Sequence, residues 1–102
     1  MVRKDLPPGA QLAQSVHVAF RFASDYRHAT HQWMDESEYI CILAAENEAE
    51  LIELLRQSKE LNIRLSVFNE PDYNNSLTAI ALEPSYESKR LCSKLKLALK
   101  EP

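Results

Sequence analysis

One histidine within a helical pattern is the first residue of this sequence that could do chemistry. His17 follows Ala10 and Gln14 and precedes Arg21, each three or four residues from the next. In a helix of about 3.6 residues per turn, this spacing places the four side chains on one face. Imidazole takes up and releases a proton near neutral pH, so the pattern permits acid–base chemistry at His17. A solvated polar face that happens to carry one histidine is also consistent with the spacing.

Two further histidines raise the question of a metal ion. His28, His31 and Asp35 would share a face if the same helix continued past residue 26. Imidazole and carboxylate groups are common metal ligands. No second cluster of such groups completes a site, and faces of this composition are usually solvated. We therefore predict no metal site.

The composition limits the classes of function. The chain has 102 residues, of which 45% are hydrophobic and 26% charged, and this fits one globular domain over residues 1–102. The net charge of −3 argues against strong non-specific binding of nucleic acid, which depends on lysine and arginine. Gly9 is the only glycine, and this excludes glycine-rich phosphate loops.

The sequence predicts a cytoplasmic protein that does not bind membranes. It contains no apolar run near the ~20 residues that span a bilayer, and its start lacks the apolar core of a signal peptide. Cys41 and Cys92 lie in apolar surroundings without Cys-x-x-Cys spacing, so we expect buried free thiols.

A helix over residues 11–26 must position His17. Its apolar side chains fall on one stripe, formed by Leu12, Val16, Ala19 and Ala23. This stripe predicts that the helix packs on a sheet through that side and leaves the His17 face free. Residues 5–9, DLPPG, form the connection that leads into the helix.

The remaining sequence predicts strands and helices in alternation. Residues 38–45 favour a strand buried on both faces, and residues 63–69 alternate as a strand does. Residues 77–83 favour another strand, which forms an antiparallel hairpin with residues 63–69 across the turn at residues 70–75.

Two further helices are predicted between and after these strands. Asn47 and Glu50 have the spacing of a capping box, and the helix that follows ends at Asn62 in a left-handed cap. The last helix begins after Pro84 and Ser85, with an apolar side formed by Leu91, Leu95 and Ala98.

The predicted order is β-α-β-α-β-β-α. It indicates an α/β fold, a three-layer α/β/α sandwich around a mixed four-stranded sheet. Sites in such sheets gather at the carboxyl ends of strands and in the loops beyond them. Residues 5–9 and 70–75 are the two loops that meet this description.

Four segments resemble the type II peptidyl-tRNA hydrolase family. Residues 2–6, VRKDL, resemble the family's V-R-x-D-L at the end of the first strand, and residues 13–17, AQSVH, resemble its A-Q-x-x-H helix motif. Residues 48–55 resemble its third helix, and residues 93–97, SKLKL, resemble its terminal G-H-L-K-L. The resemblance extends over nearly the whole chain in the family's order.

The resemblance implies hydrolysis of the ester that joins a peptide to the 3′ end of tRNA, without a metal or organic cofactor. It also implies a mixed four-stranded sheet between helices, peptidyl-tRNA as the partner and, as in several members, a homodimer. The reaction needs a water directed at the ester carbonyl and donors for the tetrahedral oxyanion.

The resemblance implies catalytic roles for three residues, namely His17, Glu70 and Thr78. His17 would polarise the water or hold the tRNA end, and Glu70 stands closest to the family's catalytic aspartate. It implies substrate-binding or positioning roles for four more: Gln14, Asp72, Arg3 and Asp5. Asp72 is the alternative to Glu70 for the catalytic carboxylate.

The chain departs from the family pattern in three places. Ala10 stands where the family has a lysine, and the loop after Glu70 is shorter. Losing one oxyanion donor costs about 10² to 10³ in rate, although Arg3 or Lys4 could replace the lost charge. The family's first strand also has apolar residues before V-R-x-D-L, so we expect a shortened reading frame here and a higher melting temperature when upstream residues are restored.

Three functions therefore stay open from the sequence. The first is a peptidyl-tRNA or related acyl-tRNA hydrolase, and the second is a non-catalytic module that binds an RNA end, a protein or a small acyl ligand. The third is a domain whose function is an interface through Trp33, Met34 and Tyr73. Binding of tRNA predicts that the basic residues cluster around His17, namely Arg3, Lys4, Arg21, Lys89, Arg90 and Lys94.

Overall fold

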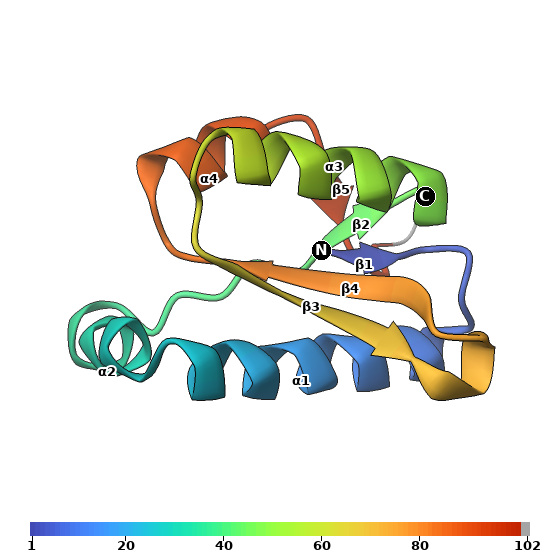
Figure 1. The fold of residues 1–102 in the computed structure, drawn as a ribbon, viewed down its shortest axis with the longest axis horizontal. Coiled ribbons are helices and arrows are strands. Elements are labelled where there is room, and N and C mark those ends of the chain that lie inside the picture. The colour runs from blue at the N-terminus through green and yellow to red at the C-terminus, as the bar shows by residue number, and fades with distance from the viewer. Residues whose placement is uncertain (101–102) are drawn as a thin grey trace.

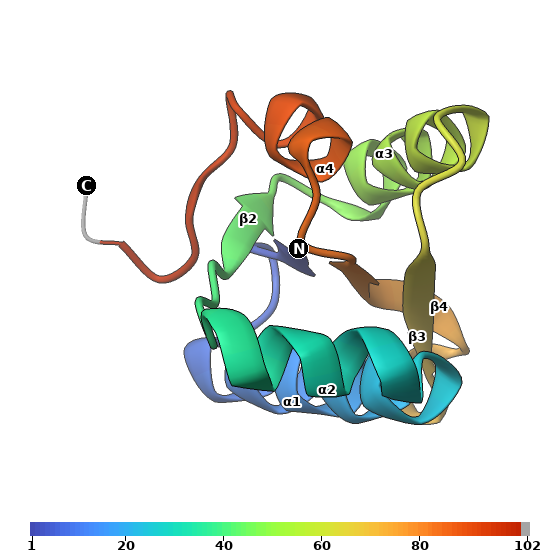
Figure 2. The same ribbon diagram turned by 90° about the vertical axis from the view of Figure 1, so that its left-hand side faces the viewer.

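Two layers of helices enclose a sheet in the computed structural model, which describes residues 1–100 (Figure 1). Helices α1 (Pro8–Asp25) and α2 (Arg27–Glu36) cover one face of the sheet. Helices α3 (Glu48–Glu60) and α4 (Tyr86–Leu91) cover the other face, as the turned view shows (Figure 2). The predicted α/β/α sandwich is confirmed.

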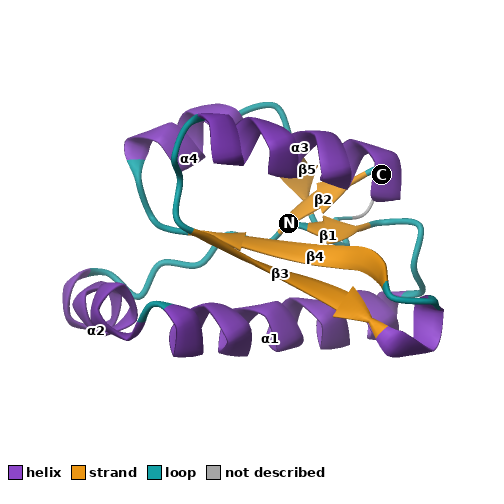
Figure 3. Ribbon diagram, viewed as in Figure 1, coloured by secondary structure: helices purple, strands orange, loops and turns teal. Residues whose placement is uncertain are grey.

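The sheet is mixed, as predicted, and its strand order is β3-β4-β1-β2-β5 (Figure 3). The strands are β1 (Val2–Arg3), β2 (Leu43–Ala45), β3 (Leu65–Glu70), β4 (Ser76–Leu82) and β5 (Lys96–Leu97). Strand β1 lies in the centre, parallel to β2 and antiparallel to β4. Strands β3 and β4 form the predicted antiparallel hairpin, and β5 adds an antiparallel edge beside β2.

The fifth strand corrects the prediction of four strands and of a long last helix. Helix α4 ends at Leu91, and the chain reaches the sheet edge at Lys96. Leu91 and Leu95 pack on the core beside α3, whereas Ala98 packs on the cluster below the other face. The three apolar residues have helical spacing but serve two sides of the sheet, so a helical pattern was the wrong interpretation.

The predicted strand over residues 38–45 is shorter than expected. Only Leu43–Ala45 forms β2, and each of its partners, β1 and β5, pairs with two of its residues. Tyr39 and Ile40 are exposed rather than buried. Cys41 is exposed as well, which corrects the expectation of a buried thiol, while Cys92 is half-buried and both thiols are free.

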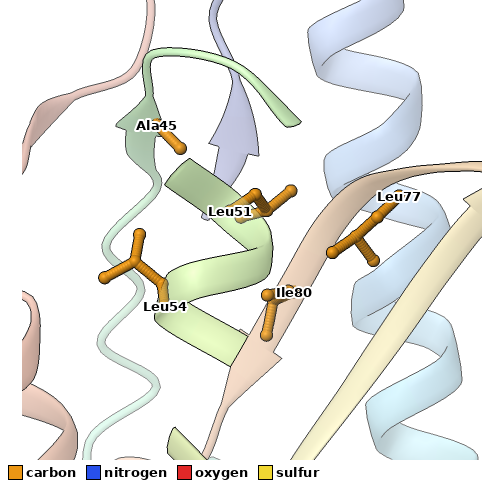
Figure 4. Packing of buried hydrophobic residues seen from close by; sticks show 5 residues of the cluster. All are labelled: Ala45, Leu51, Leu54, Leu77 and Ile80. Atoms are coloured by element: carbon orange, nitrogen blue, oxygen red, sulfur yellow. The ribbon is translucent and has the colours of Figure 1, made fainter. Parts of the chain in front are cut away.

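The larger part of the core lies between the sheet and α3. Its fully or nearly buried members are Ala45, Leu51, Leu54, Leu77 and Ile80 (Figure 4). A smaller cluster of Val2, Val18 and Ala79 lies between the sheet and α1. None of the helices within residues 1–100 is long and apolar enough to cross a membrane.

The N-cap of the capping box predicted for α3 is confirmed, and the return bond of the box goes to the residue before the cap. The Asn47 side chain accepts a hydrogen bond from the Glu50 backbone N–H at 2.9 Å, and the Glu50 carboxylate accepts from the Glu46 N–H at 3.1 Å. Asn62 follows the helix with a φ of 56°, the predicted left-handed conformation.

Candidate active site

Helix α1 packs on the sheet through the side opposite to the predicted one. Its buried residues are Gln11, Gln14 and Val18, whereas Leu12 is 56% exposed and Val16 is 53% exposed. The prediction counted apolar side chains only. The observed side is polar because both glutamines have hydrogen-bond partners, Gln14 on the sheet and Gln11 on the chain that leaves β1, and a bonded polar group can be buried at little cost. Within residues 1–100, Gln11 Oε1 is a buried atom without a partner.

Gln11 attaches the start of α1 to the chain that leaves β1. Its side-chain nitrogen donates to the carbonyl oxygens of Lys4 at 3.2 Å and Leu6 at 2.7 Å. These bonds fix the connection over residues 5–9 and hold α1 against the end of β1.

Gln14 links α1 to both strands of the hairpin. The Thr78 hydroxyl on β4 donates to Gln14 Oε1 at 2.6 Å, and Gln14 Nε2 donates to Glu70 Oε1 at the end of β3, at 2.8 Å. Gln14 is 3% exposed and Thr78 is fully buried. A charged carboxylate can only accept, so the amide nitrogen must face Glu70 and the amide oxygen must face Thr78.

Glu70 is held as a carboxylate by three neighbours. The hydrogen bond from Gln14 is the largest cause that lowers the pKa of Glu70, followed by the backbone N–H of Asp72, which donates to Glu70 Oε2 at 3.3 Å. The charge of nearby His17 lowers it further. The 3₁₀ turn η1 (Pro71–Tyr73) supplies the Asp72 contact, so the loop places a negative charge beside the histidine.

The His17 ring is oriented by a phenylalanine of β3. It stacks on the Phe68 ring with 4.5 Å between centroids and 14° between planes. His17 and Phe68 also line a hollow of about 260 Å³ with Phe20, Arg21 and Ser24. The hollow gives a substrate access to the imidazole.

The sequence model of the family Peptidyl-tRNA hydrolase PTH2 matches residues 1–98 of the 102-residue chain. The chain belongs to this family. No curated protein matches it. Membership in the peptidyl-tRNA hydrolase family agrees with the motifs around Asp5 and His17.

Four of the predicted site residues of this family member come together, a fifth contacts them through its backbone alone, and two lie apart from them. Gln14, Glu70 and Thr78 are joined by hydrogen bonds, and His17 acts on Glu70 through its charge. The predicted substrate-binding residue Asp72 is exposed on η1 and contacts Glu70 through its backbone.

The other two predicted substrate-binding residues bind each other. Arg3 Nε and Nη2 donate to the two carboxylate oxygens of Asp5, both at 2.9 Å, and Arg3 Nη1 donates to the Ser76 hydroxyl at 3.2 Å. The hydrogen bonds from Arg3 are the main reason that the pKa of Asp5 is lowered. The opposite charges of Arg3 and Asp5 therefore offset each other at the end of β1.

The cations of this family member do not surround His17 as tRNA binding predicted. Ala10 brings no charge, and the two expected substitutes are paired, Arg3 with Asp5 and Lys4 with Glu46 at 3.2 Å. Lys89 and Arg90 lie on α4, across the sheet from α1, and Lys94 follows between two leucines that pack beside α3 (Figure 2). Arg21 is the cation that lines the hollow at His17.

The predicted interface group does not form one face. Trp33 and Met34 lie on α2, while Tyr73 lies on η1 after β3, at the other end of α1 (Figure 1). Trp33 is half-buried, and its Nε1 donates to the Tyr39 carbonyl oxygen at 2.8 Å. The three residues therefore cannot act as one contact surface.

The second histidine pair also lies away from the site. The helix breaks at Tyr26, and His28, His31 and Asp35 line a separate hollow of about 320 Å³ on α2. Throughout residues 1–100, no three His, Cys, Asp or Glu side chains are arranged to hold a metal ion.

Sequence reasoning missed Phe68 as a member of the site. Phe68 lies in a strand whose alternating pattern assigns it to packing, and it does pack against the cluster below the sheet. No short-range signal indicates that a ring in β3 meets one in α1, since that contact depends on how α1 is rotated on the sheet.

Proposed function

We propose that the protein hydrolyses the ester of peptidyl-tRNA or a related acyl-tRNA and releases free tRNA. Two observations support this proposal, the family match over residues 1–98 and the group around His17. The bridge through Gln14 carries the most weight, because it fixes a charged carboxylate beside an imidazole that a substrate can reach.

In the proposed reaction, His17 accepts a proton from a water molecule whose oxygen attacks the ester carbonyl carbon. Glu70 stabilises the imidazolium that forms, and its lowered pKa suits a group that stays ionised rather than one that takes the proton. The tetrahedral intermediate then breaks its bond to the ribose oxygen, and His17 returns the proton to that oxygen.

Gln14 and Thr78 act in this proposal as positioning residues. Thr78 was expected to be catalytic, but its hydroxyl is fully buried and donates to Gln14. It orients the amide, and the amide orients Glu70. Asp72 stays a proposed substrate-binding residue at the rim of the site, and Arg3 would exchange Asp5 for a phosphate to take that role.

A second candidate is a binding module that recognises an RNA end without cleaving it. Ala10 at the lysine position and the pairing of Arg3 and Lys4 with carboxylates favour this candidate. Both features remove positive charge from the place where a tetrahedral oxyanion or a phosphate would lie. The loss of one such donor costs about 10² to 10³ in rate.

Single-turnover release of tRNA from a labelled peptidyl-tRNA tests the proposal. We expect cleavage by the parent, loss of cleavage in His17→Ala, and parent-like cleavage in His28→Ala, an exposed histidine outside the site. No cleavage by the parent, but a gain in Ala10→Lys, would support the binding module. Equal rates for the two histidine variants would contradict a role for His17.

The homodimer and the cytoplasmic location stay proposals. The first follows from the resemblance to a family with dimeric members, and mass measurement by light scattering tests it. Localisation of a tagged chain tests the second.

A further inference from the structure

The hollow beside His17 has a lining that the hydrolytic group does not use. Phe20, Arg21 and Ser24 contribute to it from α1, on the side of His17 that leads toward the end of the helix. None of the three contacts Gln14, Glu70 or Thr78 by a hydrogen bond within residues 1–100. The hydrolytic group therefore does not explain why these three side chains line the hollow.

Phe20 is not explained by packing. Its side chain is 73% exposed, the largest exposure of any phenylalanine or leucine among the exposed large hydrophobic residues. It belongs to neither core cluster of the described chain. An aromatic ring left in water costs free energy, roughly 25 cal/mol per Å² of apolar surface, so a planar ligand that covers it would be stabilised.

Another part of the lining is already an aromatic stack. His17 and Phe68 lie nearly parallel, 4.5 Å between centroids, so their outer surface offers a second flat group. Two aromatic elements around a hollow of about 260 Å³ fit one heteroaromatic ring system better than an aliphatic chain. Nucleic-acid bases stack on such side chains without base-specific hydrogen bonds.

The charge in the hollow fits a phosphate. Arg21 is exposed, and among residues 1–100 no carboxylate forms an ion pair with it. A guanidinium recognises phosphate oxygens with two parallel N–H donors. Ser24 adds a hydroxyl at the same wall.

We propose that this hollow binds the terminal nucleotide of an RNA, with the base stacked between Phe20 and the His17–Phe68 pair and the phosphate on Arg21. This inference rests on the proposed function and deepens it, because the ester to be cleaved is attached to the ribose of that nucleotide. Base stacking would bring the ribose next to His17.

Binding of adenosine 5′-monophosphate, followed by amide chemical shifts and calorimetry, tests the inference. We expect shifts at Phe20, Arg21 and Phe68, and binding about tenfold weaker in Phe20→Ala, a typical stacking loss. Leu12→Ala is the matched control, since Leu12 is an exposed apolar residue of α1 that does not line the hollow. Parent-like affinity in Phe20→Ala, or shifts elsewhere, would overturn the inference.

Two further ligands separate the contributions. Ribose 5-phosphate lacks the base, so it should bind more weakly than the nucleotide and be insensitive to Phe20→Ala. The trinucleotide CCA should bind more tightly than the mononucleotide if the site takes an RNA end, and equal affinity would overturn that assignment. Arg21→Ala should weaken all three ligands, with Arg27→Ala on α2 as the control.

The outcome is independent of the cleavage assay. Cleavage that depends on His17, without nucleotide binding in the hollow, would reject this inference and leave the proposed function intact. Nucleotide binding that depends on Phe20, without cleavage, would reject the hydrolase and keep the hollow as a nucleotide site.

Discussion

Gln14 Nε2 donates to Glu70 Oε1 at 2.8 Å, although the two residues are 56 positions apart in the chain. The contact joins the middle of α1 to the end of β3 and brings the carboxylate to the histidine one turn away. This hydrogen bond therefore joins the helix and the hairpin into one site.

Replacing Gln14 with alanine should lower both stability and cleavage. The change removes the 2.6 Å bond from the buried Thr78 hydroxyl and the bond to Glu70, and it leaves the hydroxyl a longer contact with the Phe68 carbonyl oxygen at 3.3 Å. Each lost hydrogen bond costs about 0.5–1.5 kcal/mol. Chemical denaturation and single-turnover cleavage measure the two effects. Gln32→Ala is the control, because Gln32 is an exposed glutamine of α2 whose side chain bonds only Glu36, at 3.3 Å. Equal effects of the two changes would contradict the bridge.

Thr78→Val removes the hydroxyl and keeps the shape of the side chain. We expect a loss of about 1–3 kcal/mol, because Gln14 Oε1 loses its donor inside the protein. Thr30 provides the matched comparison, since its hydroxyl is buried without a partner in the described structure. Thr30→Val should be neutral or stabilising, as it removes an unsatisfied group. Urea unfolding of both variants measures the two changes in stability. Similar losses of stability in the two variants would refute the hydrogen bond assigned to Thr78.

The lowered pKa of Glu70 predicts a pH dependence. Because the pKa in the folded state lies below the usual 4.5, Glu70 adds stability that is present above pH 4.5 and is lost as pH falls through the folded value. Glu70→Gln should therefore be less stable than the parent at pH 7, and the gap should close in acid. Urea midpoints of both proteins from pH 7 to pH 3 test this. The pKa of Asp5 is also lowered, but Asp5 is present in both proteins, so its contribution drops out of the difference between them. A stability difference that widens in acid would contradict the prediction.

Asp5→Asn should strengthen the binding of RNA. The substitution leaves Arg3 with a neutral partner in place of a carboxylate that accepts two bonds at 2.9 Å, so the guanidinium becomes available to phosphate. Affinity for an RNA hairpin should rise, and it should fall more steeply with salt than in the parent. Asp35→Asn on α2 controls for the change in net charge. Equal salt slopes for the two variants would show that Arg3 does not reach the RNA.

Local sequence signals predicted the elements whose structure depends on their own residues. The N-cap that Asn47 forms with Glu50 and the left-handed Asn62 are determined within a few residues, and the structure confirms them. The hairpin was predictable because its strands alternate on either side of a short turn. The sandwich then follows from the order of the elements.

Other predictions failed where a distant partner decides the structure. Leu12 and Val16 have the pattern of a core face, but Gln14 gains hydrogen bonds at β3 and β4, and Gln11 gains them after β1. A pattern of apolar residues alone does not include these bonds. The last helix was overextended because Leu95 and Ala98 serve opposite sides of the sheet. The site residues were predicted from motifs, and the role of Phe68 was missed because it depends on the rotation of α1.

The attachment of α1 by two glutamines has a consequence for how the helix can move. Apolar contacts lose little when a helix slides or turns by a few degrees, whereas hydrogen bonds are directional. If α1 rotated about its own axis by one residue, about 100°, the hydrogen bonds of both Gln11 and Gln14 would break. The direction in which the His17 side chain points is therefore set by two buried amides, and α1 cannot turn the imidazole away from Glu70 without breaking their hydrogen bonds.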